Sequence, residues 1–203
     1  SNNRVDSVWN RYAAIHLENN SNLIANEISL IGNNLSAGVI LDKGSTIDLG
    51  RNSSIEAGFM GVLLLNDDNK FKADQITIKV DAQPSKSQDP FAGVHINAGG
   101  SVDLGSNSTI ITGRDTTGVL LYAGDFKADS LTIHSSGENS EAINTSDVSK
   151  ASITGKSEIV GDINATGRSV IELDTTQGSA VTGAINAKGA ANISWVGTGA
   201  TWN

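Results

Sequence analysis

The stretch that decides the fold is Ala37–Gly58, AGVILDKGSTIDLGRNSSIEAG, which returns at Ala92–Gly113 as AGVHINAGGSVDLGSNSTIITG. A second pair of related strings lies between and after them. GVLLLNDDNKFKADQITIKV begins at Gly61, and GVLLYAGDFKADSLTIHS begins at Gly118. The two kinds of unit therefore alternate along the chain. Self-similarity of this kind is the sequence signature of a repeat architecture, so the interval and the pattern inside each unit decide the fold.

Each unit begins with a small residue followed by an aliphatic one, which allows the units to be aligned. The intervals are 24, 23, 32, 25 and 24 residues, counted between the successive starts Ala14, Gly38, Gly61, Gly93, Gly118 and Ala142. Asp162-Ile163 and Ala184-Ile185 continue the series more weakly, at steps of 20 and 22 residues. The one long interval contains the insertion DAQPSKSQDPF, residues 81–91. The chain is thus predicted to hold about eight units.

Short alternating strings inside each unit predict strands. Val39 and Leu41 are separated by one residue, as are Ile47 and Leu49, and Gly, Asn or Asp interrupts the strings. Helical repeats would need apolar residues three and four positions apart over ten or more positions, and leucine-rich repeats would need a fixed leucine scaffold; neither pattern occurs. The sequence therefore predicts an all-β fold, a right-handed parallel β-helix (a solenoid) with three short strands per coil.

One coil could not fold by itself. Its five or six aliphatic side chains contribute on the order of 10 kcal/mol when buried, whereas ordering roughly twenty residues costs about 1 to 2 kcal/mol for each residue. Coils stacked about 4.8 Å apart pair their strands and align equivalent side chains in inward columns. Leu49 and Leu104 are expected two coils apart in one such column. The other predicted columns are Ile15, Val39, Val62, Val94, Val119 and Ile143, and Leu17, Leu41, Leu64, Ile96 and Leu121.

Composition limits the classes of partner. The formal net charge of -8, with no local cluster of Lys and Arg, repels phosphate backbones and anionic lipids, so neither nucleic acid nor a membrane surface is expected as a partner. Cysteine is absent, so the stability of an exported chain would come from a long repetitive core. The longest apolar runs, such as Val62–Leu65, are too short to span a bilayer. An export signal or membrane anchor is therefore expected outside this sequence.

The strings GSTIDLGRNSSI, GSVDLGSNSTI and FKADSLTI, with VTGAINAKGAANISWVGTGATWN at the C-terminus, resemble passenger domains of autotransporters of Gram-negative bacteria. The likeness covers nearly the whole chain and is greatest to the pertactin-like and self-associating adhesin groups. It implies type V secretion through the periplasm and an outer-membrane β-barrel, followed by display on the cell surface. It also implies adhesion, with a host-surface protein or glycan, or the same protein on a neighbouring cell, as the partner.

On this resemblance residues 1–203 are expected to form a single β-helix domain, a fragment of a longer passenger. Residues 81–91 are expected to be an inserted loop. Residues 190–203, which contain Trp195 and Trp202, resemble the start of the stabilising region that precedes the membrane translocator. Contact with a membrane would then be made only through a C-terminal β-barrel outside this sequence.

The first strand of each unit carries an unusually apolar outward strip. Strand alternation places one outward residue between the two inward ones. Either the strip is an exposed binding patch, or the insertion at residues 81–91 covers it. The strip consists of His16, Ile40, Leu63, His95, Leu120 and Asn144.

Polar residues form a second candidate surface. Thr46 and Asp48, with Ser101 and Asp103 in the related unit, are expected to face outward as a polar ladder, together with Thr77 and Thr132. Such a ladder could pair with the same ladder on another copy in an antiparallel two-fold contact. The insertion is a third candidate, because loops that project from a rigid scaffold often carry recognition; its residues are Pro84, Lys86 and Pro90.

Carboxylate pairs are the only basis for an enzymatic alternative, a carbohydrate-active β-helix enzyme or a tailspike-like protein. Asp67 and Asp68 are adjacent in a turn, which is typical of a solvated loop. Asp48 and Asp103 occupy equivalent places about 10 Å apart, slightly beyond the range of inverting glycosidases. A solvated loop is therefore preferred for the first pair and a structural repeat role for the second, and the chain is expected not to be an enzyme. A passive stalk for another domain is the remaining alternative.

The other catalytic and metal-binding classes have even less support in the sequence. The three histidines lie in strand patterns without a Ser or Asp context for a triad, and no Gly-Asp-Ser-Gly string occurs. Cysteine, paired histidines at ligand spacing and Asp-rich nonapeptides are all missing, so no metal ion and no cofactor are expected.

Overall fold

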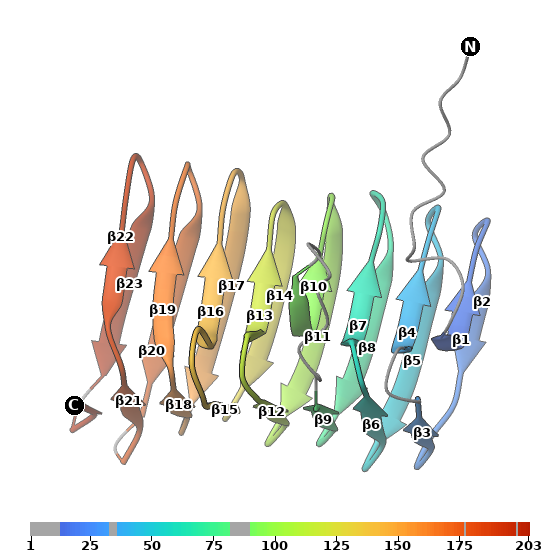
Figure 1. Ribbon diagram of the computed structural model, residues 1–203, viewed down its shortest axis with the longest axis horizontal. Coiled ribbons are helices and arrows are strands. Elements are labelled where there is room, and N and C mark those ends of the chain that lie inside the picture. The colour runs from blue at the N-terminus through green and yellow to red at the C-terminus, as the bar shows by residue number, and fades with distance from the viewer. Residues whose placement is uncertain (1–12, 33–35, 82–89, 177, 198) are drawn as a thin grey trace.

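The computed structural model describes residues 13–32, 36–81, 90–176, 178–197 and 199–203. These residues form 24 β-strands and no helix. Three strands make one coil, and the coils stack side by side into an elongated solenoid (Figure 1). Within the described residues no helix is present that could cross a membrane.

The first strands of the coils form sheet A, the second strands sheet B and the third strands sheet C. The strands of sheet A are β1 (Ala13–Leu17), β4 (Ala37–Leu41), β7 (Met60–Leu64), β10 (Phe91–Ile96), β13 (Thr116–Leu121), β16 (Glu141–Thr145), β19 (Asp162–Ala165) and β22 (Ile185–Ala187). Those of sheet B are β2 (Asn22–Ile24), β5 (Thr46–Arg51), β8 (Lys70–Asp74), β11 (Gly100–Ser106), β14 (Gly124–Asp129), β17 (Ser149–Gly155), β20 (Val170–Thr175) and β23 (Asn192–Gly197). Those of sheet C are β3 (Ser29–Ile31), β6 (Ser54–Ala57), β9 (Thr77–Val80), β12 (Thr109–Thr112), β15 (Thr132–Ser135), β18 (Glu158–Val160), β21 (Ala180–Thr182) and β24 (Thr201–Trp202).

Every strand pairs in parallel with the equivalent strand of the neighbouring coil, so each of the three sheets contains eight strands. We number the coils from coil 1 (β1 to β3) to coil 8 (β22 to β24). The prediction of an all-β parallel β-helix with three short strands per coil is therefore confirmed.

The strand register also confirms the predicted inward columns. Val39 pairs with Val62, and Val62 pairs with Val94. Leu49 and Leu104 are fully buried on β5 and β11, two coils apart as expected. The weaker units at the C-terminal end continue the Val39 column of sheet A with Ile143, Ile163 and Ile185.

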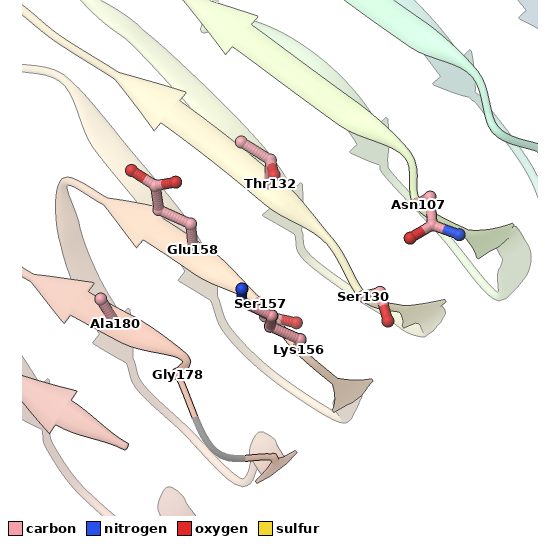
Figure 2. A pocket seen from close by; sticks show the side chains of 8 residues that line it. All are labelled: Asn107, Ser130, Thr132, Lys156, Ser157, Glu158, Gly178 and Ala180. Carbon is pink, nitrogen blue, oxygen red and sulfur yellow. The ribbon is translucent and has the colours of Figure 1, made fainter. Parts of the chain in front are cut away.

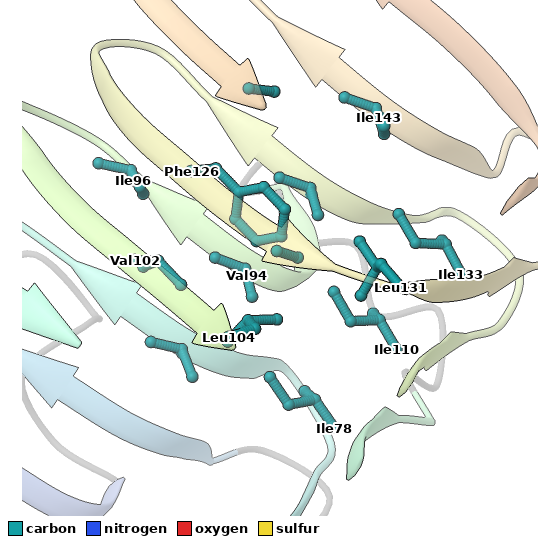
Figure 3. Close-up of a cluster of buried hydrophobic side chains, with 14 of the residues drawn as sticks. Ile78, Val94, Ile96, Val102, Leu104, Ile110, Phe126, Leu131, Ile133 and Ile143 are labelled. Atoms are coloured by element: carbon teal, nitrogen blue, oxygen red, sulfur yellow. The ribbon is translucent and has the colours of Figure 1, made fainter. Parts of the chain in front are cut away.

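The inward column of sheet B alternates large and small side chains. Phe71 pairs with Val102, and Val102 pairs with Phe126. Figure 3 shows the Phe126 ring among inward side chains from the other two sheets, including Val94 and Ile133. A valine between two phenylalanines leaves room for both rings, so the alternation of the two unit types fills the interior evenly.

At the corner between sheets B and C, buried serines alternate with aliphatic residues from one coil to the next. Ser108 is buried, its hydroxyl donates to the Leu104 carbonyl at 2.6 Å, and it accepts the Ile76 backbone N–H at 3.1 Å. Ser157 accepts the Leu131 backbone N–H at 3.1 Å in the same way. In coils 1 to 6, each even-numbered coil therefore has a serine at this corner, and the odd-numbered coil before it has an aliphatic residue. The serine hydroxyl accepts the backbone N–H of that aliphatic residue.

Parts of two segments that were predicted to have distinct roles, the insertion at residues 81–91 and the C-terminal residues 190–203, belong to regular strands. Phe91, the expected last residue of the insertion, belongs to β10 and packs edge-on against Phe59, with ring centroids 4.9 Å apart. The insertion is therefore shorter than expected at its C-terminal side. At the other end of the chain, β23 pairs with β20 and β24 pairs with β21, so Asn192–Gly197 and Thr201–Trp202 are two regular strands of coil 8.

Gly61 belongs to a column of glycines on the first strands, together with Gly38, Gly93 and Gly118. We expect Gly61→Ala to lower the free energy of unfolding by about 1 to 3 kcal/mol. A Cβ at this position would lie 2.3 Å from the Gly93 carbonyl oxygen and 2.4 Å from Ile78 Cγ2. Urea unfolding followed by circular dichroism measures the loss.

Gly113→Ala is the matched control, because no atom lies within 4 Å of the Cβ that it would add. It should change the stability by less than about 0.5 kcal/mol. Equal unfolding of the two variants would show that packing does not require the glycine column.

Candidate functional site

The apolar strip of sheet A points away from the main core, as predicted, but most of it is buried. Ile40, Leu63, His95 and Leu120 are between 1% and 3% exposed, and the three aliphatic residues belong to a second apolar cluster separate from the interior. The alternative of an exposed binding patch is therefore wrong for these four residues. Their burial agrees with the other alternative, a covered strip, but residues 82–89 of the insertion lie outside the described residues, so cover by the insertion stays a prediction. His16, at the first coil, is partly exposed, and its Nε2 lies 3.2 Å from Glu18 Oε1.

His95 is the ionisable group within this buried strip. Its ring meets the Tyr122 ring edge-on, with centroids 5.1 Å apart. Removal from water disfavours the imidazolium and lowers the pKa of His95 from 6.5 to about 4. At neutral pH this ring is uncharged, as its apolar neighbours Leu63 and Leu120 require.

The strip becomes polar after coil 5. The Glu141 carboxylate accepts hydrogen bonds from the side-chain amides of Asn144 and Asn164, both at 2.7 Å. Asn164 in turn accepts from the Asn186 amide at 2.9 Å. Stacked amides replace stacked apolar groups over the last three coils, so sheet A presents two chemically different halves.

The outer face of sheet B carries the predicted polar ladder, with a feature that we did not predict. Asp48 pairs in register with Lys72, and Lys72 pairs with Asp103, which pairs with Lys127. Lys72 Nζ lies 3.6 Å from Asp48 Oδ2. The column therefore alternates negative and positive charge over coils 2 to 5.

Charge also varies in the columns on either side of this one. In one neighbouring column Thr46 is followed by Lys70, Ser101 and Asp125. On the other side, Arg51 Nε donates to Asp74 Oδ2 at 2.8 Å. Asp74 Oδ1 in turn accepts the Ser106 backbone N–H, and Ser106 pairs with Asp129.

The predicted structural role of the two repeated aspartates is confirmed. Asp48 Oδ1 accepts the Gly50 backbone N–H at 2.9 Å, and Asp103 Oδ1 accepts that of Gly105 at 3.0 Å. Both glycines adopt positive φ, 57° and 55°, so each aspartate stabilises the turn that ends its strand. The second oxygen of each carboxylate is left for ion pairing on the face.

A shallow hollow on this face gathers carboxylates, with Asp74, Asp103 and Asp129 around Lys127. Hydrogen bonds from the backbone and side chain of Ser106, with Arg51, lower the pKa of Asp74. An aspartate held in its ionised form is suited to binding a cation or a donor group, not to donating a proton. Among the described residues no three His, Asp or Glu side chains are placed to hold a metal ion.

The remaining carboxylate pair lies in an exposed turn. Asp67 and Asp68 are exposed between β7 and β8, and Asp68 adopts a positive φ of 63°. The neighbouring Asn69 is buried and stabilises the turn, since its Oδ1 accepts the Ser45 backbone N–H at 2.9 Å. The predicted solvated loop is therefore confirmed.

A separate groove runs across coils 4 to 7 at the corner between sheets B and C (Figure 2). Its volume is about 280 Å³. The sequence alone did not predict this groove, although Thr132 at its edge was expected to face outward. Its lining residues are Asn107, Ser130, Thr132, Lys156, Ser157, Glu158, Gly178 and Ala180.

The predicted site residues thus have different outcomes. Thr46, Asp48, Ser101 and Asp103 lie together on sheet B, whereas the sheet A strip is buried over coils 2 to 5. Pro90 is partly exposed beside β10. Pro84 and Lys86 lie outside the described residues. Aligning FKAD with the Asp-Leu-Gly string of the other unit type would have revealed the alternating lysines.

We expect His95→Leu to reduce the loss of stability in acid. The unfolded chain binds a proton at His95 near pH 6.5, whereas the folded chain binds it only near pH 4. Titration of His95 therefore leaves the free energy of unfolding unchanged above pH 6.5. As pH falls from 6.5 toward 4, proton binding by the unfolded chain lowers the free energy of unfolding, by about 3 kcal/mol. Leucine matches Leu63 and Leu120 in the column and removes the titrating group. Urea unfolding between pH 4 and 8 measures the difference.

His134→Gln is the control, because the His134 side chain is 49% exposed. Its effect on the pH dependence should be much smaller than that of His95→Leu, because this side chain is already largely in water. If the His95→Leu profile matches the wild type, burial of His95 does not contribute to acid sensitivity.

Asp103→Ala should lower the free energy of unfolding by about 1 kcal/mol, because the Gly105 N–H loses its acceptor at the turn. Asp103→Asn retains Oδ1 and should lose less. Asp125→Ala, on an exposed position of the neighbouring column, serves as the control in thermal unfolding. Equal losses for Asp103→Ala and Asp125→Ala would contradict the turn-stabilising role.

Comparisons with protein-family models, with curated proteins and with solved structures find no match to this chain. The expectation of an autotransporter passenger therefore rests on the quoted sequence strings alone. Three surfaces of the described residues bear on function: the charged face of sheet B, the buried strip of sheet A and the polar groove at the corner between sheets B and C.

Proposed function

We propose that this chain is a self-association module, displayed on the surface of a Gram-negative bacterium as part of an autotransporter passenger. Copies would pair through the outer face of sheet B. The secretion route and the location are supported only by the sequence resemblance. The observation that supports self-association is the alternation of charge from Asp48 through Lys72 and Asp103 to Lys127.

A two-fold axis parallel to the strands reverses the order of the coils and keeps each column opposite itself. With the axis between coils 3 and 4, Lys72 faces Asp103 of the second copy, and Asp48 faces Lys127. In the neighbouring column Arg51 faces Asp129. Each of these pairs is of opposite sign, so the face is complementary to itself.

Shifting the two copies by one coil destroys this match. In one direction Lys72 faces Lys127 and Asp103 faces its own counterpart. In the other direction Lys72 faces its own counterpart and Asp48 faces Asp103. Like charges opposite one another disfavour both shifts, so the column selects a single antiparallel register.

The proposed contact is polar over coils 2 to 5, about 19 Å at the spacing of paired strands. Exposed ion pairs contribute about 0 to 1 kcal/mol each, so a single pair of copies should associate weakly and in a salt-dependent manner. Many copies on two cell surfaces would engage together and convert weak contacts into firm aggregation.

Charge reversal tests the register. We expect Lys72→Glu and Asp103→Lys each to weaken self-association at least about tenfold, because each places like charges across the axis. An equal mixture of the two variants should restore association, since the introduced glutamate of one copy then faces the introduced lysine of the other, and the retained Asp103 faces the retained Lys72. Sedimentation velocity at low and moderate salt measures all three, and aggregation of cells that display the chain provides the second readout.

Lys79→Glu on sheet C, where Lys79 pairs with Glu56, is the control and should leave association unchanged. A wild-type chain that sediments as a monomer at every concentration and leaves cells dispersed would overturn the proposal in favour of a passive stalk. Turnover of a polysaccharide would instead favour the enzymatic alternative.

A further inference from the structure

The groove at the corner between sheets B and C is formed by a change in side-chain size between coils 6 and 7. Lys156 and Glu158 project from coil 6, whereas the equivalent places in coil 7 are occupied by Gly178 and Ala180. A Cβ at Gly178 would lie 3.4 Å from Lys156 Cε, so the end of the lysine side chain lies beside Gly178. Figure 2 shows these residues along the groove. The hollow exists because Gly178 and Ala180 are small, and the two charged side chains form its wall.

The groups that line the groove offer hydrogen bonds to a ligand. Among the described residues Lys156 has no ion-pair partner. Asn107 adds an amide and Thr132 a hydroxyl, and both face the groove from earlier coils. Glu158 contributes an acceptor, although its Oε1 lies 3.3 Å from Nε2 of the exposed His134. The groove therefore presents its groups in two neighbouring columns along the solenoid axis: Thr132 pairs with Glu158 in one, and Lys156 lies two residues before Glu158 in the other.

This set of groups selects the chemistry of the ligand. Lys156 can only donate and requires an acceptor, best a carboxylate, whereas the Glu158 carboxylate can only accept and requires hydroxyl donors. A sugar acid carries both. A heavily sulfated or phosphorylated chain is disfavoured by Glu158 and by the net charge of -8. The groove has a volume of about 280 Å³ and is partly open to solvent.

We propose that this groove binds a short stretch of a glycan that contains hexuronic acid residues. The uronate carboxylate pairs with Lys156, and ring hydroxyls donate to Glu158 and bond with Asn107 and Thr132. The site lies on a different face from the charged columns of sheet B, so it does not depend on self-association.

The test uses trigalacturonate as the probe and isothermal titration calorimetry as the measurement. The acid should bind, and its methyl ester, which keeps every hydroxyl but loses the charge, should bind at least about tenfold more weakly. Lys156→Met should cause a similar loss. Ala180→Ile should also weaken binding, because a β-branched side chain suits a strand and fills the groove while Lys156 stays in place.

Two controls separate this site from the rest of the surface. Lys127→Gln removes an exposed lysine of sheet B and should leave trigalacturonate binding unchanged. Lys72→Glu, which tests self-association, should also leave it unchanged, so that failure of one proposal is not mistaken for failure of the other.

The proposal would be overturned by absence of trigalacturonate binding, by equal affinity for the acid and its ester, or by full affinity in the Lys156→Met chain. Equal binding of triglutamate would also contradict it, because any carboxylate would then suffice and the hydroxyl contacts would contribute nothing.

Discussion

Pairing between successive coils is the interaction on which the rest of this structure depends. No described strand pairs with its neighbour in sequence; each bonds to the equivalent strand one coil away, in three parallel sheets. Backbone groups in the interior are therefore satisfied only when the coils stand in register. The register in turn stacks Val39 on Val62 and Phe71 on Val102, so backbone pairing and side-chain packing support the same arrangement.

The alternation of two unit types links the interior to the surface. Inside, serines such as Ser108 alternate with aliphatic residues at one corner, and the hydroxyl satisfies a backbone N–H of the neighbouring coil. Outside, the same alternation places Asp48 and Asp103 in even coils and Lys72 and Lys127 in odd ones. The interior packing and the surface charges thus both repeat every two coils. When a second copy lies antiparallel to the first, a charge pattern of this period can place opposite charges against each other.

The groove on sheet C depends on the opposite feature, a local break in the repetition. Small residues in coil 7 follow charged ones in coil 6, and the mismatch hollows a surface that regular stacking would keep flat. Sheet A shows a third arrangement, in which an outward strip is apolar and buried in early coils and gives way to a ladder of asparagines around Glu141. One backbone plan therefore presents three chemically different faces.

The sequence by itself determined the fold, the three strands per coil, the inward columns and the structural role of Asp48 and Asp103, because strand alternation and a period in the twenties dictate direction and spacing. An alignment of the two unit types on FKAD would also have placed Lys72 between those aspartates. Only the tertiary structure decided that Ile40, Leu63 and His95 are buried, since alternation says which way a side chain points and not whether that face is covered. The groove beside Lys156 likewise required the structure, because its shape comes from the relative size of side chains in neighbouring coils.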